Sequence, residues 1–219
     1  MRRLVPNQQR PLLDIAHLEV YPNERIGLMG ASGSGKSTLL RVIAGLDPCQ
    51  SGEVRFQGNV VKGETMTAYR RQVMFLPQRS ALAATTVGEN FRLPFQWKVA
   101  RDLYDEQVVL SLLDRFGRSA AFLDQPAEAI SGGEAQMVAL IRAIQLRPRV
   151  LLLDEPTASL DTEAVRTFES VLIGWQQEAS GSTAGRALVM VSHDAEQVQR
   201  ISTRTLRLDQ GTFGEGQND

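Results

Sequence analysis

Eight residues close to the N-terminus have the types and the spacing of a phosphate-binding loop. The pattern G-x-x-x-x-G-K-[ST] is matched by Gly30, Ala31, Ser32, Gly33, Ser34, Gly35, Lys36 and Ser37. In this pattern the glycines let backbone N–H groups curl around phosphate oxygens, and the following helix adds partial positive charge at its N-terminus. Lys36 is expected to reach the β- and γ-phosphates, and Ser37 to offer its hydroxyl to Mg²⁺. With Thr38, the loop predicts a site for a nucleoside triphosphate; a chance glycine-rich turn is the weaker explanation, since a predicted strand and helix flank it.

Two carboxylates follow the most apolar strand that the sequence predicts. Asp154 and Glu155 come directly after the run 150–153, at the strand end where α/β sheets bind ligands. Asp154 is expected to hold Mg²⁺ through water, and Glu155 to polarise an attacking water as general base. A solvated strand end before the Pro156 turn is the alternative, and the phosphate loop upstream favours the functional interpretation.

A serine and two glycines open the helix predicted over 133–146. Ser131 and Glu134 fit an N-cap with a capping-box partner. That explanation does not cover Gly132 and Gly133, which are poor helix formers but let a backbone approach a phosphate closely. The four residues therefore predict a second phosphate contact.

The elements that must position these residues alternate between strands and helices. Strands are expected over 12–20, 25–29, 53–56, 73–76, 150–153, 187–191 and 204–208, and helices over 36–44, 105–116, 133–146 and 162–175. Residues from Gly211 onward are small and polar, and we expect them to be frayed. The chain thus predicts a single α/β domain over 1–219, with a mostly helical insertion over about 79–147.

Composition excludes several other classes of protein. The 219 residues are 42% apolar, and 24 basic against 25 acidic side chains give a net charge of −1, which argues against nucleic-acid binding through a broad basic face. Cys49 is the only cysteine, so no intrachain disulfide is possible, as fits a reducing cytosol. We find no apolar core of a signal peptide, and the longest apolar runs are too short to span a bilayer. Any membrane role is expected to go through a partner.

With these motifs in order, nearly the whole chain resembles the ABC-type ATPases. The tetrad at Ser131 looks like the family's signature motif, whose usual form ends in glutamine. Gln78 matches the Q-loop glutamine of the family. Residues 158–161, which end in Asp161, resemble the D-loop, and His193 matches the switch histidine. Taken singly, Gln78 fits a turn residue, Asp161 a helix cap and His193 a loop histidine. Their joint order and spacing favour the family.

The resemblance implies a fold and a mechanism. The fold would be a P-loop NTPase core with a mostly parallel sheet, an N-terminal antiparallel β subdomain and a helical subdomain insertion. The activity would be hydrolysis of ATP with Mg²⁺, with Lys36, Gln78, Glu155 and His193 as catalytic groups. Gln78 would also contact Mg²⁺ and couple it to the insertion, and His193 would contact the γ-phosphate. In the implied head-to-tail homodimer, the signature of one subunit covers the ATP of the other.

The implied partner is a separate transmembrane permease, which places the chain in the cytoplasm, peripheral to the inner membrane. A soluble ABC ATPase with a non-membrane partner is the alternative, but such proteins usually carry two ATPase domains or a long coiled-coil insertion. A nucleotide-gated module without hydrolysis is a third, and the retained Lys36, Glu155 and His193 argue against it.

Two departures from the family pattern stand out. Met137 occupies a position that is usually arginine, which we expect to change packing or a surface contact rather than chemistry. The family also stacks an aromatic ring on adenine from a loop before the phosphate loop, but no aromatic residue precedes Tyr21, and the window 5–8 holds Val5, Pro6, Asn7 and Gln8. Either adenine lacks a ring here, or the first strand is clipped and the start codon lies upstream.

The region after Gln78 should face the permease, so it is where a subgroup would be recognised. It resembles the small ATPases similar to bacterial iron-export ATPases and their plant aluminium-tolerance relatives, in residues 69–73, 86–87, 90–91, 93–95 and 140–161. This resemblance implies metal export, although no residue of such a subunit touches the cargo.

Overall fold

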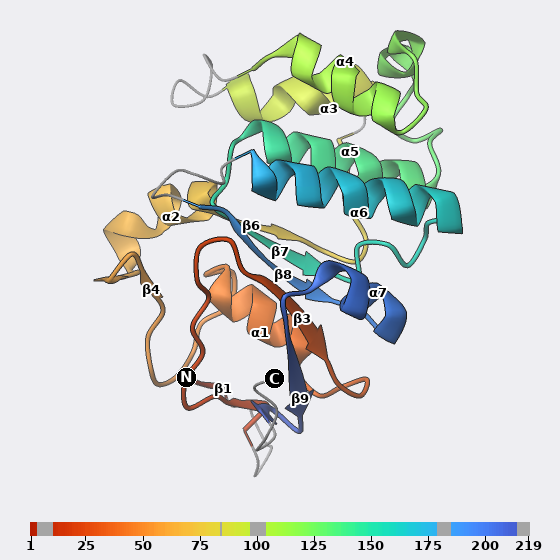
Figure 1. The fold of residues 1–219 in the computed structure, drawn as a ribbon. Helices are drawn as coiled ribbons and strands as arrows, with labels where there is room; N and C mark the ends of the chain where they lie inside the picture. The colour runs from red at the N-terminus through yellow and green to blue at the C-terminus, as the bar shows by residue number, and fades with distance from the viewer. Residues whose placement is uncertain (4–10, 84, 97–103, 179–184, 214–219) are drawn as a thin grey trace.

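A six-stranded sheet forms the centre of the computed structural model, which describes residues 1–3, 11–83, 85–96, 104–178 and 185–213 (Figure 1). The strands follow the order β10-β9-β3-β8-β7-β6. Their bounds are Thr212–Phe213, Arg204–Asp209, Arg25–Met29, Ala187–Val191, Val150–Asp154 and Val73–Leu76. All neighbours pair in parallel except β10, which runs antiparallel to β9. The predicted α/β fold class with a mostly parallel sheet is confirmed.

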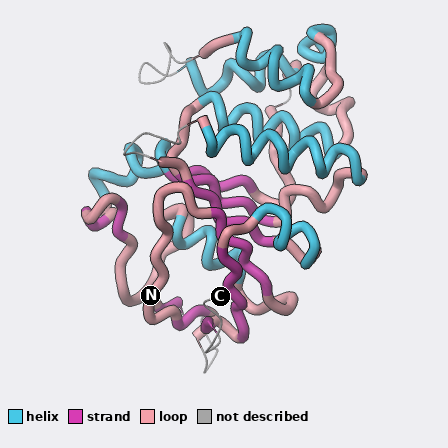
Figure 2. Tube along the Cα trace, viewed as in Figure 1, coloured by secondary structure: helices cyan, strands magenta, loops and turns pink. Residues whose placement is uncertain are grey.

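Helices cover both faces of this sheet, which explains why its inner strands are apolar without interruption. In β7, Leu151 and Leu153 point into one core cluster and Leu152 into another. The first cluster packs against α5 (Gly132–Gln145) and α6 (Thr162–Gln177), and the second against α1 (Lys36–Ile43). Figures 1 and 2 show α5 and α6 side by side over one face, with α1 on the other.

A separate apolar core holds the helices between β6 and β7. It joins α3 (Val87–Arg92), α4 (Glu106–Arg115) and α5 through Phe91, Leu113 and Ile141, all fully buried. Met137 lies in the same core at 4% exposure. The methionine therefore packs inside the helical layer, where an arginine would bring a charge into an apolar cluster.

The N-terminal part differs from the prediction of one strand over 12–20. Only β2 (Leu13–Asp14) is a strand there, paired with β1 (Arg2–Arg3), and Ile15 continues the ladder by donating to the carbonyl of Met1 at 2.8 Å. The alternating apolar side chains persist to Val20, but a strand also needs a neighbour for its N–H and C=O groups. A second small hairpin pairs β4 (Arg55–Phe56) with β5 (Asn59–Val60).

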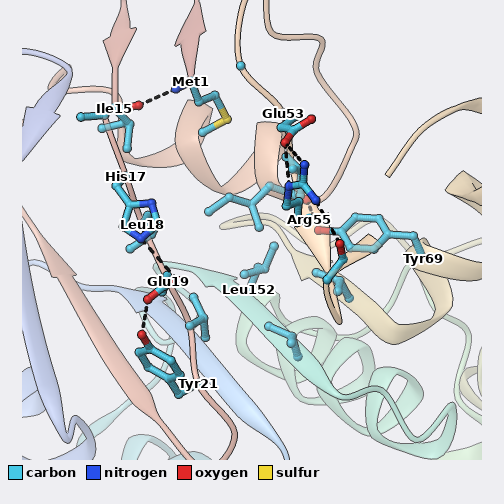
Figure 3. A pocket seen from close by; sticks show the side chains of 18 residues that line it. Met1, Ile15, His17, Leu18, Glu19, Tyr21, Glu53, Arg55, Tyr69 and Leu152 are labelled. Carbon is cyan, nitrogen blue, oxygen red and sulfur yellow. Dashed lines mark hydrogen bonds and ion pairs between the residues drawn. The ribbon is translucent and has the colours of Figure 1, made fainter. Parts of the chain in front are cut away.

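A cavity of about 670 Å³ lies between these N-terminal segments and the edge of the main sheet (Figure 3). Ile15, Leu18 and Leu152 form part of its apolar wall, and Glu19 and Arg55 line its polar side. Among the described residues, none that is predicted to contact nucleotide lines it. This cavity is thus distinct from the phosphate-loop part of the predicted site.

Three further elements were not predicted. They are α2 (Met66–Gln72), α3 and α7 (Ala195–Ile201). The expectation of a frayed end from Gly211 is wrong for Thr212 and Phe213, which form β10, while residues 214–219 lie outside the described part. Of the helices described, none combines the length and the apolar character needed to cross a bilayer.

Candidate functional site

The predicted phosphate loop lies between β3 and α1, as the sequence indicated. Gly35 is the N-cap of α1 with φ of 102°, a left-handed conformation that favours glycine. Gly30 has φ of 150°, and a Cβ there would lie 2.1 Å from the carbonyl oxygen of Leu208. The glycines therefore allow the loop to pass tightly over β9 and turn into the helix.

Lys36 is held inside this loop by the loop's own backbone. Its ammonium Nζ donates to the carbonyl oxygens of Gly30 at 2.8 Å and Ala31 at 2.9 Å, and the residue is 6% exposed. No carboxylate of the described residues lies within ion-pair distance of it, and a buried cation without a counter-ion suits an anionic ligand. The loop therefore fits a triphosphate.

Ser37 and Asp154 meet at the carboxyl end of β7. The Ser37 hydroxyl donates to Oδ1 of Asp154 at 3.0 Å. Burial raises the pKa of Asp154, while the Ser37 hydrogen bond acts in the opposite direction. Hard oxygen donors of this kind are what Mg²⁺ takes from proteins, which usually give it one or two carboxylates and leave the rest to phosphate and water. The pair fits Mg²⁺ bound together with a triphosphate.

Two candidate residues from separate strand ends contact the carboxylate of a third, Glu155. Gln78, two residues after β6, donates through Nε2 to Oε2 of Glu155 at 3.0 Å. His193, two residues after β8, lies with Nε2 2.9 Å from Oε1 of Glu155. Both carboxylate oxygens are thus held from opposite sides. Glu155 itself has φ of 47°, a strained conformation of the kind that clusters at functional sites.

The histidine side of this cluster opens into a cavity of about 290 Å³. Glu155 and His193 line it together with Leu160. The loop carrying His193 is fixed by Ser192, whose buried hydroxyl donates to Oε1 of Gln197 at 2.8 Å and accepts the N–H of Asp194 at 3.0 Å. This support was not predicted; the only sequence signal is an Asp suited to cap α7.

The predicted signature turn lies at the N-terminus of α5. Ser131 caps the helix, and its hydroxyl accepts the backbone N–H of Glu134 at 3.2 Å. A Cβ on Gly133 would lie 2.9 Å from the carbonyl oxygen of Ser159, so this glycine permits close packing on the predicted D-loop. Asp161 caps α6 by accepting from Ala164 N–H at 2.8 Å, the structural role left open for it.

The signature turn and the phosphate loop do not meet within one chain. Across the part of the chain that the structure describes, no hydrogen bond or ion pair joins residues 131–134 to residues 30–38. The predicted contacts of Ser131, Gly132 and Gly133 with nucleotide therefore need a second copy and stay predictions. The adenine window with Val5 and Gln8 lies outside the described residues.

Sequence analysis missed one buried side chain, which links α5 to the segment that carries Gln78. Gln136, on α5 and 2% exposed, donates through Nε2 to the carbonyl oxygen of Pro77 at 3.0 Å. Its Oε1 has no partner among the described residues. Since Pro77 precedes Gln78, this bond fixes the backbone that presents Gln78 to Glu155. The residue type alone gave no signal, because most glutamines are exposed.

Comparison with known proteins agrees with this geometry. A family described as ABC transporter matches residues 13–158. The chain is 30% identical over 204 residues to the tungstate uptake system ATP-binding protein TupC of Peptoclostridium acidaminophilum, covering 93% of this chain and 90% of that protein. It is 39% identical over 185 residues to protein STAR1 of Oryza sativa subsp. japonica, covering 84% of this chain but 51% of that protein.

A solved structure extends the likeness to three dimensions. The dimeric structure of a post-hydrolysis state of the ATP-binding cassette MJ0796, bound to ADP and Pi, superposes with a TM-score of 0.81 at 27% identity. The match covers 98% of this chain and 94% of that one.

Proposed function

This chain belongs to the ABC transporter family of ATP-hydrolysing domains, and from that premise we propose that it dimerises around ATP and drives a separate transmembrane permease. The observation that carries the proposal is the meeting of Gln78 and His193 at the two oxygens of Glu155, beside Asp154 and Ser37. A carboxylate oriented from both sides, next to the buried Asp154 and the exposed Ser37 hydroxyl, suits metal-assisted hydrolysis.

Each residue takes a role that its contacts prepare. Ser37 and Asp154 would hold Mg²⁺, which when bound offsets the charge of the transferred phosphoryl group. The amide N–H of Gln78 donates to Glu155, so the amide oxygen Oε1 of Gln78 remains available as a ligand for that ion. Glu155 accepts the proton of the attacking water on its carboxylate, and His193 fixes the orientation of that carboxylate.

Lys36 supplies the positive charge of the loop. Its amine now donates to two loop carbonyls, so it already points to the centre of the loop that would receive phosphate. Asp154 attracts this cation without forming an ion pair with it, so the triphosphate would supply the negative charge in direct contact.

We place the second half of the site on another copy of the chain. Ser131 and Gly132 stand apart from the phosphate loop of their own chain, yet their turn offers a hydroxyl and a helix N-terminus that suit an anion. A head-to-tail homodimer would bring this turn over the nucleotide held by the other copy. Two equal composite sites follow, with Asp161 and its loop between them.

The proposed location is the cytoplasmic face of the inner membrane, where the chain would be peripheral and held by its permease. TupC, named for tungstate uptake, supports a transport role. Metal export, which the subgroup resemblance implied, stays a prediction, because that relative is named for uptake and STAR1 is about twice as long as the matched part.

Two measurements test the proposal. A phosphate-release assay with ATP and Mg²⁺ distinguishes a hydrolysing subunit from a nucleotide-gated module, for which no turnover is expected. Identification of the membrane protein that co-purifies from gently solubilised native membranes distinguishes a transporter subunit from a soluble ATPase. Recovery of only non-membrane partners, with normal turnover, would leave the soluble alternative as the better explanation.

A further inference from the structure

The signature turn of this chain carries a full negative charge. Glu134 stands where the family usually has glutamine, and its Oε2 accepts the backbone N–H of Ser131 at 2.8 Å. Burial raises the pKa of Glu134, but the Ser131 N–H, the Ser131 hydroxyl and the Arg118 guanidinium together outweigh burial, and the pKa lies below its ordinary value. The carboxylate is therefore ionised at neutral pH, within three residues of the serine and glycines of the turn.

The second oxygen of the Glu134 carboxylate pairs with the Arg118 guanidinium. The Arg118 guanidinium lies 3.2 Å from Oε1 of Glu134, and its carbon lies 5.8 Å from the centroid of the Phe122 ring. Phe122 is 3% exposed in the core of the helical layer, so the ring is a fixed platform for the cation.

The backbone of Arg118 is fixed as well. Gly117, with φ of 67°, ends α4 in a left-handed turn, and its N–H donates to the carbonyl of Asp114 at 2.8 Å. The N–H of Arg118 reaches back to the carbonyl of Leu113 at 2.9 Å. This C-terminal motif aims the next side chain from α4 toward the start of α5. Arg118 is 46% exposed, and the Glu134 carboxylate, the Phe122 ring and this backbone turn together restrict where its side chain can lie.

We propose that Arg118 is a positioning residue of the signature turn, which cancels the charge of Glu134 so that the turn can accept the triphosphate held by a second copy. The inference rests on the proposed function, since only in the dimer does this turn face phosphate. Without Arg118 the ionised Glu134 would repel the incoming triphosphate, and glutamine at that position would need no such partner.

The experiment uses full-length chains with Glu155→Gln, in which hydrolysis is slow and the ATP-bound dimer accumulates. Gel filtration over a range of ATP concentrations at low salt gives the concentration for half-maximal dimer. Arg118→Ala should raise it about 3–10-fold, an effect that shrinks at high salt as the repulsion is screened. Glu134→Gln keeps the oxygen that caps Ser131, and Arg118→Ala combined with it should dimerise at or below the parent's ATP concentration.

Two controls separate this role from a structural one. Arg92→Ala removes a matched arginine of the same helical layer, which pairs with Glu106 at 2.6 Å and covers the Tyr104 ring at 5.7 Å, and should leave dimerisation unchanged. Arg118→Lys keeps the charge and should stay close to the parent. An equal loss for Arg118→Ala with and without Glu134→Gln, or no loss at all, would overturn the proposal. If the Glu155→Gln parent itself forms no ATP-dependent dimer, the proposed function fails instead.

Discussion

Replacing Glu155 by glutamine should stop turnover while leaving the fold and ATP binding intact. The glutamine has the same shape, but it cannot take a proton from water, and loss of a general base typically costs about 10²–10⁴-fold in rate, or about 3–5 kcal/mol of barrier. The structural cost is far smaller. The pair with His193 is partly exposed, with the imidazole 53% accessible, and such pairs contribute about 0–1 kcal/mol.

These magnitudes make the two effects separable in one set of assays. A stability loss within about 1 kcal/mol shifts the melting temperature of a chain of this length by about 2–4 °C at most. Phosphate release should fall by at least about a hundredfold, and gel filtration with ATP should show an accumulated dimer. Glu106→Gln, which changes an exposed carboxylate on α4 that pairs with Arg92, serves as the control and should turn over normally. Near-normal hydrolysis by Glu155→Gln would refute the assignment of the base.

Three further predictions concern the rest of the site. In mixed dimers with Ser131→Arg on one copy and Lys36→Ala on the other, one composite site carries both substitutions and the other site is intact. Phosphate release should therefore exceed that of either mutant homodimer. Full activity of the Ser131→Arg homodimer would contradict the role of the turn. Asp154→Asn should abolish hydrolysis but raise the melting temperature of the nucleotide-free chain at neutral pH. Burial raises the Asp154 pKa, so the ionised form is destabilising above that pKa, and an unchanged or lower melting temperature would contradict this reasoning. For the 219-residue chain, in which no aromatic residue precedes Tyr21, competition binding should discriminate weakly between ATP and GTP. A strong preference of this chain for ATP would mean that another of its residues recognises adenine.

Elements with two buried faces or clear caps were predictable from sequence. β7 reads as an apolar run because α5 and α6 cover one face and α1 the other. The helix α5 starts one residue before its predicted bound, since Ser131 and Glu134 form the cap that the sequence indicated. The phosphate loop followed from the glycine spacing together with Lys36, Ser37 and the flanking elements, because its geometry depends on backbone conformations that few residues other than glycine adopt.

The failures have a different physical cause, since each strand depends on a neighbouring strand that its own residue pattern does not identify. Residues 12–20 alternate as a strand should, but among the described residues only Leu13 and Asp14 are paired as a strand, and the backbone bonds to residues 1–3 run no further than Ile15. Thr212 and Phe213 lack a strong pattern, yet β9 supplies an edge to pair with. The sequence predicted that Gln78, His193 and Glu155 belong to one site, but it did not predict that the first two contact the third. The order of residues in the chain does not fix which side chains touch.

The contacts around α5 explain how the helical layer and the catalytic carboxylate can act together. Its first residues form the signature turn, and one turn later Gln136 holds the carbonyl of Pro77, next to the residue that holds Glu155. Both bonds are donated by side-chain amide N–H groups, and Oε1 of Gln136 has no hydrogen-bond partner among the described residues. A shift of α5 must therefore carry Pro77 with it or leave a buried amide unsatisfied, which costs about 1–3 kcal/mol. A displacement of Gln78 from Glu155 by ligand would act on the same backbone, so the signature turn and the general base are linked through Pro77 and Gln78.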